Sequence, residues 1–193
     1  ISNKVNCFAT SAACRRLKVD VLFAPAALYA QDHSTWVEES SLSRGRCGES
    51  RPTHFRGVAT VVAKLFNIVL PDVVMFGQKD AQQCDVITRM VRDLNFPVRV
   101  RVLPTVRERD GLAMSSRNRY LTDDERKQAP EFHRALRTAA QAGPARAAGA
   151  ARRLLKNRGF RVDYAEVASG RLCAAIFLGK ARLIDNVRVE SRK

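Results

Sequence analysis

The clearest feature of the sequence is an apolar run that ends abruptly at a glycine and a polar segment. Val73–Phe76 is apolar throughout, Gly77 follows at once, and Gln78–Gln83 is polar and opens a helical pattern. Such a run predicts a buried parallel strand, followed by a tight turn and a helix N-terminus. We therefore expect a strand, a turn and a helix over residues 73–94.

Similar patterns predict further helices and strands before residue 105. Apolar residues at helical spacing lie over 51–70 and, more loosely, over Asn3–Leu17, whereas Val19–Ala24 predicts another buried strand. Valines that alternate with arginines over 98–102 predict a strand with one wet face, which Pro104 ends. We expect one α/β domain over residues 1–105 and a second domain over 106–193.

The second domain has a different pattern. Thr122 and Glu125 form a capping-box signature for a helix over 123–141, and a proline opens a second helix over 144–159. Three apolar segments then predict strands at Phe160–Val167, Cys173–Leu178 and Arg182–Val189. These elements predict a small α+β domain.

Candidate chemistry lies where the strand at 73–76 ends. In open α/β sheets, ligands bind at the carboxyl ends of the strands and near helix N-termini. Lys79, Asp80 and Gln83 stand there, placed to hold a phosphate, a hydroxyl and a polar substrate, and Gly77 lets a ligand approach the backbone. A solvated helix cap explains Lys79 and Asp80 equally well, so both interpretations stay open on these residues alone.

A second polar loop, Asp110–Leu121, carries the other half of the signal. It places Ser115 and Ser116 beside Arg117. An arginine offers a planar fork of donors and serines add short, adjustable ones, a combination that suits a polyphosphate.

Four ordered, correctly spaced segments carry a family resemblance: RPTHFRGV from Arg51, FGQKDAQQ from Phe76, PTVRERDGLAMSSRNRYL from Pro104 and ARLIDN from Ala181. Together they resemble the pantothenate synthetase (pantoate–β-alanine ligase) family, from about Val19 to the C-terminus. The resemblance implies an α/β fold with an incomplete Rossmann-like parallel sheet of the nucleotidylyl transferase type, followed by a small α+β domain.

The activity that the resemblance implies is an adenylation. The pantoate carboxylate attacks the α-phosphorus of ATP, and the β-alanine amine then displaces AMP. By motif match, Lys79 would neutralise α and β phosphate oxygens, while Ser115, Ser116 and Arg117 would close on the β and γ phosphates. These four are the expected catalytic residues, and Mg²⁺ would travel with the phosphates.

The same match implies contacts to the nucleoside and to pantoate. Gly77 and Asp80 would hold the ribose, and Val106 and Met114 would offer backbone atoms to adenine. Gln83 would bond a pantoate hydroxyl.

Arg51 and His54 precede a predicted helix in a segment that lines the family's active-site crevice. Arg51 is therefore an expected substrate-binding residue, acting on a phosphate or on the shape of the site. For His54, a structural role is at least as well supported as a catalytic one. Asp185 and Asn186 are expected to be structural and to pin the final turn.

The sequence departs most from the family before about Cys14. The family's first strand, its H-x-G-H motif and its pantoate-holding Asn and Gln segment do not occur, and His33, His54 and His133 show no such pairing. We expect a poor catalyst, because each lost transition-state donor typically costs about a hundredfold to a thousandfold. An unpaired sheet edge also favours self-association, so a homodimer is expected.

Composition adds two alternatives and a location. The formal charge of +15 allows a basic polyanion-binding protein, although no motif supports a dedicated nucleic-acid function. The other alternative is a catalytically incomplete ATP-binding relative. No apolar run reaches bilayer length, no signal segment opens the chain, and five scattered cysteines fit a reducing compartment. A cytoplasmic protein without a membrane partner is expected.

Overall fold

The computed structural model describes residues 11–189, and these divide between Thr35 and Trp36 into two compact units. In the first unit, residues 11–16 are helical, and the rest of the helix predicted over Asn3–Leu17 lies outside the described residues, as does Cys7. The domain boundary predicted between residues 105 and 106 falls inside the second unit and stays a prediction. No helix within residues 11–189 is long and apolar enough to span a membrane.

The strand predicted at Val19–Ala24 is wrong. The structure assigns no strand to these residues, and Val21 is 80% exposed. A parallel strand is stabilised by hydrogen bonds to a neighbour and by packing on both faces. Without a neighbouring strand, an apolar run gains nothing from an extended conformation and does not form a strand.

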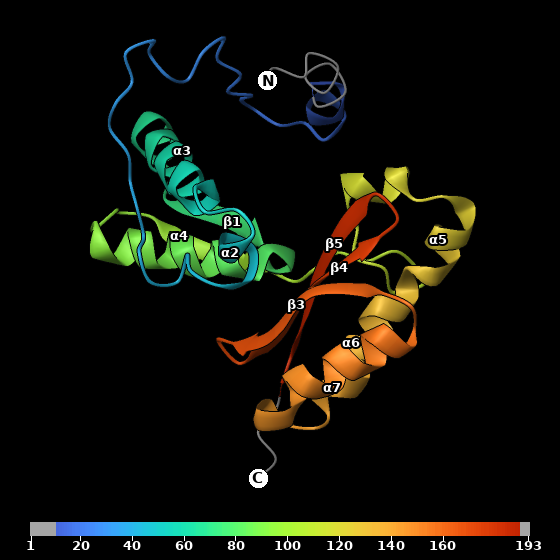
Figure 1. Cartoon of the computed structure of the whole chain (residues 1–193). Coiled ribbons are helices and arrows are strands. Elements are labelled where there is room, and N and C mark those ends of the chain that lie inside the picture. The colour runs from blue at the N-terminus through green and yellow to red at the C-terminus, as the bar shows by residue number, and fades with distance from the viewer. Residues whose placement is uncertain (1–10, 190–193) are drawn as a thin grey trace. The chain divides into compact units, whose positions relative to one another are not determined.

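The first half of the second unit is a parallel strand pair with three α-helices (Figure 1). Its elements are α2 (Arg46–Glu49), α3 (His54–Val69), β1 (Val73–Gly77), η1 (Gln78–Asp80), α4 (Ala81–Asp93) and β2 (Arg99–Leu103). β1 and β2 pair in parallel, with Val73 opposite Arg99. Val74 and Phe76 of β1 pack against the buried residues of α3 and α4. The predicted strand, helix and parallel arrangement are confirmed here.

Burial of β1 differs from the prediction. Val73 and Met75 point away from the core, and Met75 is 68% exposed. An uninterrupted apolar run predicts burial on both faces. Within the described residues only one face of the pair is covered, so the strand alternates between packed and exposed positions.

The second half is an antiparallel sheet covered by helices. It comprises η2 (Ser116–Tyr120), α5 (Asp123–Gln128), α6 (Pro130–Ala140), α7 (Pro144–Asn157), β3 (Arg161–Ala168), β4 (Arg171–Leu178) and β5 (Ala181–Arg188). Figure 1 shows α6 and α7 running along the sheet. Leu172, Ala174 and Ile176 of the central strand β4 pack in the core beneath these helices.

Both Thr122 and Glu125 make the expected capping-box hydrogen bonds at the start of α5. The single helix predicted over 123–141 is instead two helices that meet at Pro130. Proline has no N–H to donate to the carbonyl four residues earlier, and its ring crowds that carbonyl. The apolar periodicity of the sequence therefore continues through Pro130, whereas the backbone hydrogen bonds of the helix are interrupted there.

Candidate active site

Lys79 lies in η1, directly beyond the carboxyl end of β1. Its Nζ donates a hydrogen bond to the Met114 carbonyl oxygen at 3.0 Å, which ties this turn to the serine loop. Burial lowers the pKa of Lys79 from its usual value, and the positive charge of Arg117 adds to this, although Asp80 and Asp185 oppose it. The site therefore holds a cation at some electrostatic cost, which a bound anion would relieve.

A cavity of about 130 Å³ opens beside this lysine. Its lining brings together five of the residues singled out in the sequence: Arg51, Lys79, Asp80, Gln83 and Arg117. Sites for whole small ligands usually measure about 300–1,000 Å³. The enclosed space therefore fits one phosphate or a small acid, and a larger ligand would extend from it into the open.

His54 also lines the cavity and reports its positive character. Its pKa is lowered, first by burial and then by the nearby Arg51, with Asp80 acting in the opposite direction. A neutral imidazole among guanidinium groups can accept or donate a hydrogen bond without adding further repulsion.

Asp185 and Asn186 line the cavity as well, whereas five residues expected to contact the nucleotide do not: Gly77, Val106, Met114, Ser115 and Ser116. Ser115 caps η2, its Oγ accepting a hydrogen bond from the Arg117 N–H at 3.2 Å. Ser116 is exposed beside it. The Met114 N–H donates to the Val106 carbonyl at 3.0 Å. The side chains of these two residues are 55% and 67% exposed, so an apolar surface flanks the loop.

Gly77 has open space where a side chain would stand. A Cβ at this position would meet no protein atom within 4 Å, and the backbone there is ordinary extended chain. Neither packing nor backbone conformation within the described residues demands a glycine. The vacant volume lies at the carboxyl end of β1, where a ligand would approach.

Asn186, in β5, stabilises the turn that carries Lys79 (η1), which is called the lysine turn below. This residue is 2% exposed in the middle of β5, and its Nδ2 donates to the carbonyl oxygens of Gln78 at 2.8 Å and Lys79 at 3.1 Å. The expectation that it pins the final turn is wrong, because it sits within a strand, opposite Cys173. Its amide braces the backbone that carries Lys79.

Asp185, the neighbour of that asparagine, anchors a buried ionic network. Its two carboxylate oxygens accept from the Arg107 guanidinium at 2.7 and 2.9 Å, and one also contacts His133 Nδ1 at 3.1 Å. Burial raises the pKa of Asp185, but the bonds from His133 and Arg107 outweigh it, so the pKa lies below its usual value. The carboxylate is thus kept ionised inside the protein.

Sequence reasoning missed a further polar group beside the cavity. Arg182 donates to Asp163 Oδ2 at 2.7 Å, and both its terminal nitrogens lie 3.6 Å from Cys47 Sγ. Tyr164 OH is 3.4 Å from the same sulfur. The segment ARLIDN contains this arginine, so the signal was present in the sequence, whereas nothing in the sequence pointed to Tyr164.

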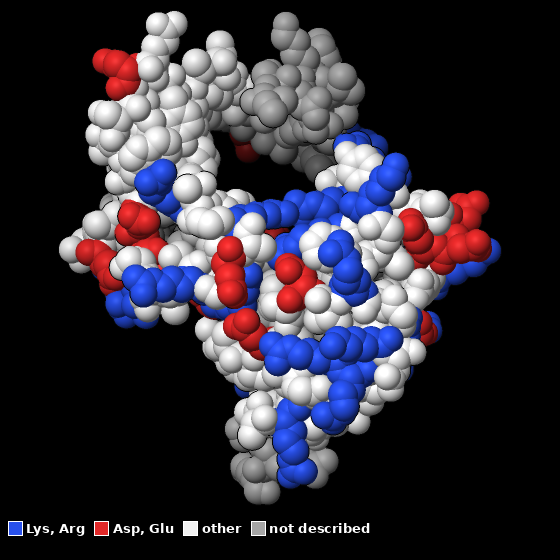
Figure 2. All heavy atoms as spheres, in the orientation of Figure 1, with Lys and Arg blue, Asp and Glu red and all other residues white. Residues whose placement is uncertain are grey.

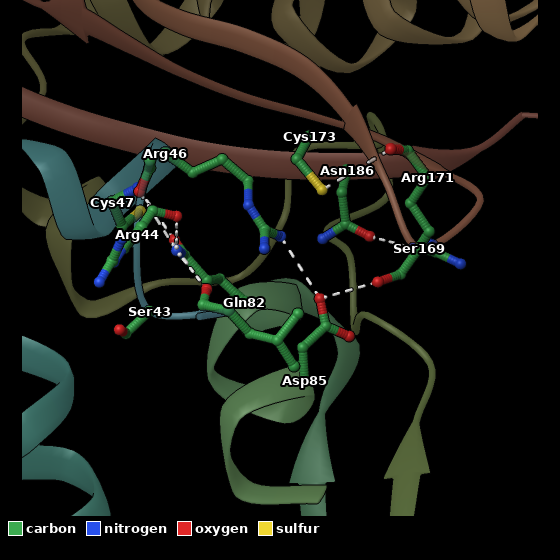
Figure 3. Close-up of polar contacts among 12 residues, drawn as sticks. Ser43, Arg44, Arg46, Cys47, Gln82, Asp85, Ser169, Arg171, Cys173 and Asn186 are labelled. Atoms are coloured by element: carbon green, nitrogen blue, oxygen red, sulfur yellow. Dashed lines mark hydrogen bonds and ion pairs between the residues drawn. The ribbon is translucent and has the colours of Figure 1, made fainter. Parts of the chain in front are cut away.

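Gln82, on the buried side of α4, fixes the start of α2, which carries this cysteine, and the residues just before it. Its Nε2 lies within hydrogen-bond distance of the carbonyls of Leu42, Arg44 and Gly45, and its Oε1 accepts from the Cys47 N–H at 3.0 Å (Figure 3). One glutamine thereby joins α4 to the start of α2 and to the residues that precede it.

These features define a class: an α/β protein with a cationic ligand site at the carboxyl end of a parallel sheet. The sequence profile of the pantoate-beta-alanine ligase family matches residues 7–188. The pantothenate synthetase of Desulfovibrio desulfuricans is 49% identical over 195 aligned positions, covering 89% of this chain and 69% of the relative. The chain belongs to the pantoate–β-alanine ligase family.

Solved structures agree with this assignment. Pantothenate synthetase from Thermus thermophilus superposes with a TM-score of 0.87 at 41% identity, covering 95% of this chain and 74% of that one. Pantoate-beta-alanine ligase from Francisella tularensis, solved in complex with beta-gamma ATP and beta-alanine, gives 0.80 at 31% identity, covering 94% and 69%. The predicted fold class, an α/β parallel sheet followed by a small α+β region, is confirmed.

Proposed function

We propose that this chain serves the family's reaction, the ATP-dependent condensation of pantoate and β-alanine through pantoyl adenylate, and that it catalyses this reaction poorly. The observation that carries the proposal is the cationic cavity at the end of β1, lined by Arg51, Lys79, Arg117 and Arg182. The Francisella relative, which was solved with an ATP ligand and β-alanine, supports the choice of substrates.

In the first step, a pantoate carboxylate oxygen bonds to the α-phosphorus of ATP and the bond to pyrophosphate breaks. Lys79 neutralises charge on the α and β phosphates, and Ser115, Ser116 and Arg117 hold the β and γ phosphates. Such a transfer needs positioning and charge neutralisation rather than a side-chain nucleophile. The β-alanine amine then attacks the acyl carbon and expels AMP.

The nucleoside extends along the open side of the site. The space beside Gly77 admits the ribose, which Asp80 binds through its exposed carboxylate. The exposed side chains of Val106 and Met114 cover the adenine, and the Val106 N–H is a backbone donor for it. The Met114 N–H and carbonyl already bond Val106 and Lys79, so adenine would meet the side chain of Met114 rather than those two atoms.

Pantoate fits the enclosed part of the site. Gln83 lines the cavity on the first turns of α4 and bonds a pantoate hydroxyl, while Arg51 faces the carboxylate or a phosphate. Pantoate is a small hydroxy acid, and the cavity of about 130 Å³ matches it better than a nucleotide.

Magnesium is the metal implied by this chemistry. Within residues 11–189, no group of three or more His, Cys, Asp or Glu side chains stands ready to hold a metal ion. This fits Mg²⁺, which keeps most of its waters and binds through substrate phosphates, screening their charge.

A cytoplasmic homodimer completes the proposal. The exposed apolar face of β1 supports the dimer, and the free, scattered cysteines support the location.

Pantoate-dependent exchange of labelled pyrophosphate into ATP tests the function. Exchange that needs pantoate supports it, whereas ATP binding without exchange would identify a catalytically incomplete relative. Lys79→Ala should weaken ATP binding and leave the melting temperature nearly unchanged, with exposed Lys156→Ala as the control. A large loss of stability with intact ATP binding would make Lys79 structural.

Gln83→Ala separates the two substrates. We expect weaker pantoate binding and unchanged ATP binding, measured by calorimetry, with exposed Gln141→Ala as the matched control. Equal losses for both ligands would contradict the assignment of this glutamine to pantoate.

A further inference from the structure

A second cationic hollow lies apart from the cavity beside Lys79. It is an open groove of about 1,060 Å³ between α4 and the β4–β5 pair, and it shares no lining residue with that cavity. Four arginines line it: Arg89 and Arg92 from α4, Arg171 from β4 and Arg188 from β5. An adjoining hollow of about 790 Å³ shares the latter two and adds Arg107 and Arg137.

Negative charge is scarce in this groove. Asp85 is the acidic residue among its described lining, and this carboxylate already contacts Arg46 at 3.4 Å and Ser169 at 3.0 Å (Figure 3). Among the described residues, no ion pair reaches Arg89, Arg171 or Arg188. Figure 2 shows basic side chains spread over the visible face, with acidic ones among them.

The arginines at its centre face one another directly. Arg171 and Arg188 are opposite partners in the antiparallel register of β4 and β5, a placement in which like charges destabilise a sheet. Burial lowers the pKa of Arg171, and the charges of Arg188 and Arg107 lower it further, while Cys173 and Asp185 oppose them. The Arg171 Nε donates to the neutral amide oxygen of Asn186 rather than to a carboxylate.

We propose that this groove binds a small polyanion bearing several phosphate groups, centred on Arg171 and Arg188. Guanidinium groups bind phosphate oxygens in pairs, and a bound phosphate would relieve the repulsion across the strands. Among the described residues, no Phe, Tyr or Trp lines either hollow, so the groove lacks the large aromatic side chains on which single-stranded nucleic acids commonly stack. The observations therefore favour a compact organic or inorganic polyphosphate over a nucleic acid.

Inorganic tripolyphosphate is the probe, measured by calorimetry at low salt without magnesium. The experiment uses the Lys79→Ala chain, so that binding at the proposed ATP cavity is suppressed. Combining Arg89→Gln with Arg188→Gln should weaken binding at least about tenfold, as expected when charged hydrogen bonds are lost. The control combines Arg152→Gln with Arg153→Gln, which removes the same two charges from exposed sites on α7, and it should change the affinity less than about twofold.

The melting temperature provides a second test, first in the protein without a bound anion. Arg188→Gln removes one of the two facing charges, so it should raise the melting temperature slightly when no anion is present. Tripolyphosphate should then raise the melting temperature of the Arg188-containing chain more than that of the variant. If Arg188→Gln failed to fold, Arg89→Gln on the helix side of the groove would take its place in the binding experiment.

Several outcomes would overturn the proposal. Equal weakening by the Arg152→Gln and Arg153→Gln control would mean diffuse attraction to a basic surface. Binding that is absent in the Lys79→Ala chain, or insensitive to the groove variants, would place tripolyphosphate elsewhere. Tighter, groove-dependent binding of a single-stranded oligonucleotide would make the occupant a nucleic acid. Pyrophosphate exchange is read separately, so failure here leaves the proposed ligase function untouched.

Discussion

The two halves of the second unit differ in how completely their strands are buried. In the antiparallel half, strand β4 is buried along nearly its whole length between helices and loop. In the parallel half, one face of the β1–β2 pair stays open, with Val73, Met75 and Leu103 exposed. The contrast implies that stability is concentrated in the antiparallel half, while the parallel half contributes the turn on which the chemistry depends.

Two charged residues beside the cavity, Asp185 and Lys79, show a similar contrast. Asp185 in the antiparallel half is 3% exposed and fully engaged by Arg107 and His133. Lys79 in the parallel half has one hydrogen bond, to a backbone carbonyl, and no carboxylate within salt-bridge distance among the described residues. A satisfied charge holds structure together, and an unsatisfied one is available to a ligand.

The largest expected effect comes from removing the satisfied charge. Asp185→Ala leaves the Arg107 guanidinium half-buried without its bidentate partner, and loss of one member of a buried pair typically costs about 3–5 kcal/mol. The control is Asp124→Ala, whose side chain is 94% exposed in an ion pair with Lys127, and it should cost less than about 1 kcal/mol. Urea denaturation measures both free energies of unfolding. Similar losses would remove the distinction between the halves.

Leucine truncations compare the two apolar surfaces. Leu172→Ala in β4 empties a fully buried site and should cost about 2–5 kcal/mol, whereas Leu103→Ala in β2, 46% exposed, should cost less than about 1.5 kcal/mol. Chemical denaturation of both variants gives the comparison. A larger loss for Leu103 would mean that its open face is covered in solution, as in the homodimer proposed above.

Local patterns predicted most of this fold. The capping box, the proline at the start of α7 and the alternating valines of β2 each encode structure through neighbouring residues, so they were found from sequence. Two predictions were wrong, for different reasons: the strand at Val19–Ala24 and the continuous helix through Pro130. The first depends on a distant pairing partner, and the second on one missing N–H that the periodicity does not register.

The site divides in the same way. Lys79, Gln83 and Arg117 were found because they follow recognisable motifs at the ends of elements, and the cavity brings them together. The brace from Asn186 spans more than a hundred residues of sequence, and its amide looks like any other in a strand. Contacts of that kind follow from tertiary packing and cannot be derived from a residue's neighbours in the chain.

That brace gives a prediction of intermediate size. Asn186→Ala leaves the Gln78 and Lys79 carbonyls without their donor and should cost about 1–3 kcal/mol of stability. Asn157→Ala, at the exposed end of α7, is the control. If the amide also positions the lysine turn, ATP affinity should fall even at temperatures where the variant is fully folded. Stability loss with unchanged ATP affinity would restrict the amide to a structural role.

The smallest expected effect is a pH dependence at Lys79. Its pKa in the folded chain is lowered, chiefly by burial, so between that lowered value and the ordinary 10.5 the folded state binds fewer protons than the unfolded state. Stability should therefore rise slightly with pH across this window, although partial solvent exposure keeps the effect small. ATP affinity should change in the opposite direction, because the deprotonated amine no longer neutralises phosphate. Lys79→Arg keeps its charge throughout and should remove both trends, as followed by denaturation and ATP titration at a series of alkaline pH values. The same alkaline loss of ATP affinity in the arginine variant would assign the titration to another group and leave Lys79 a solvated helix cap.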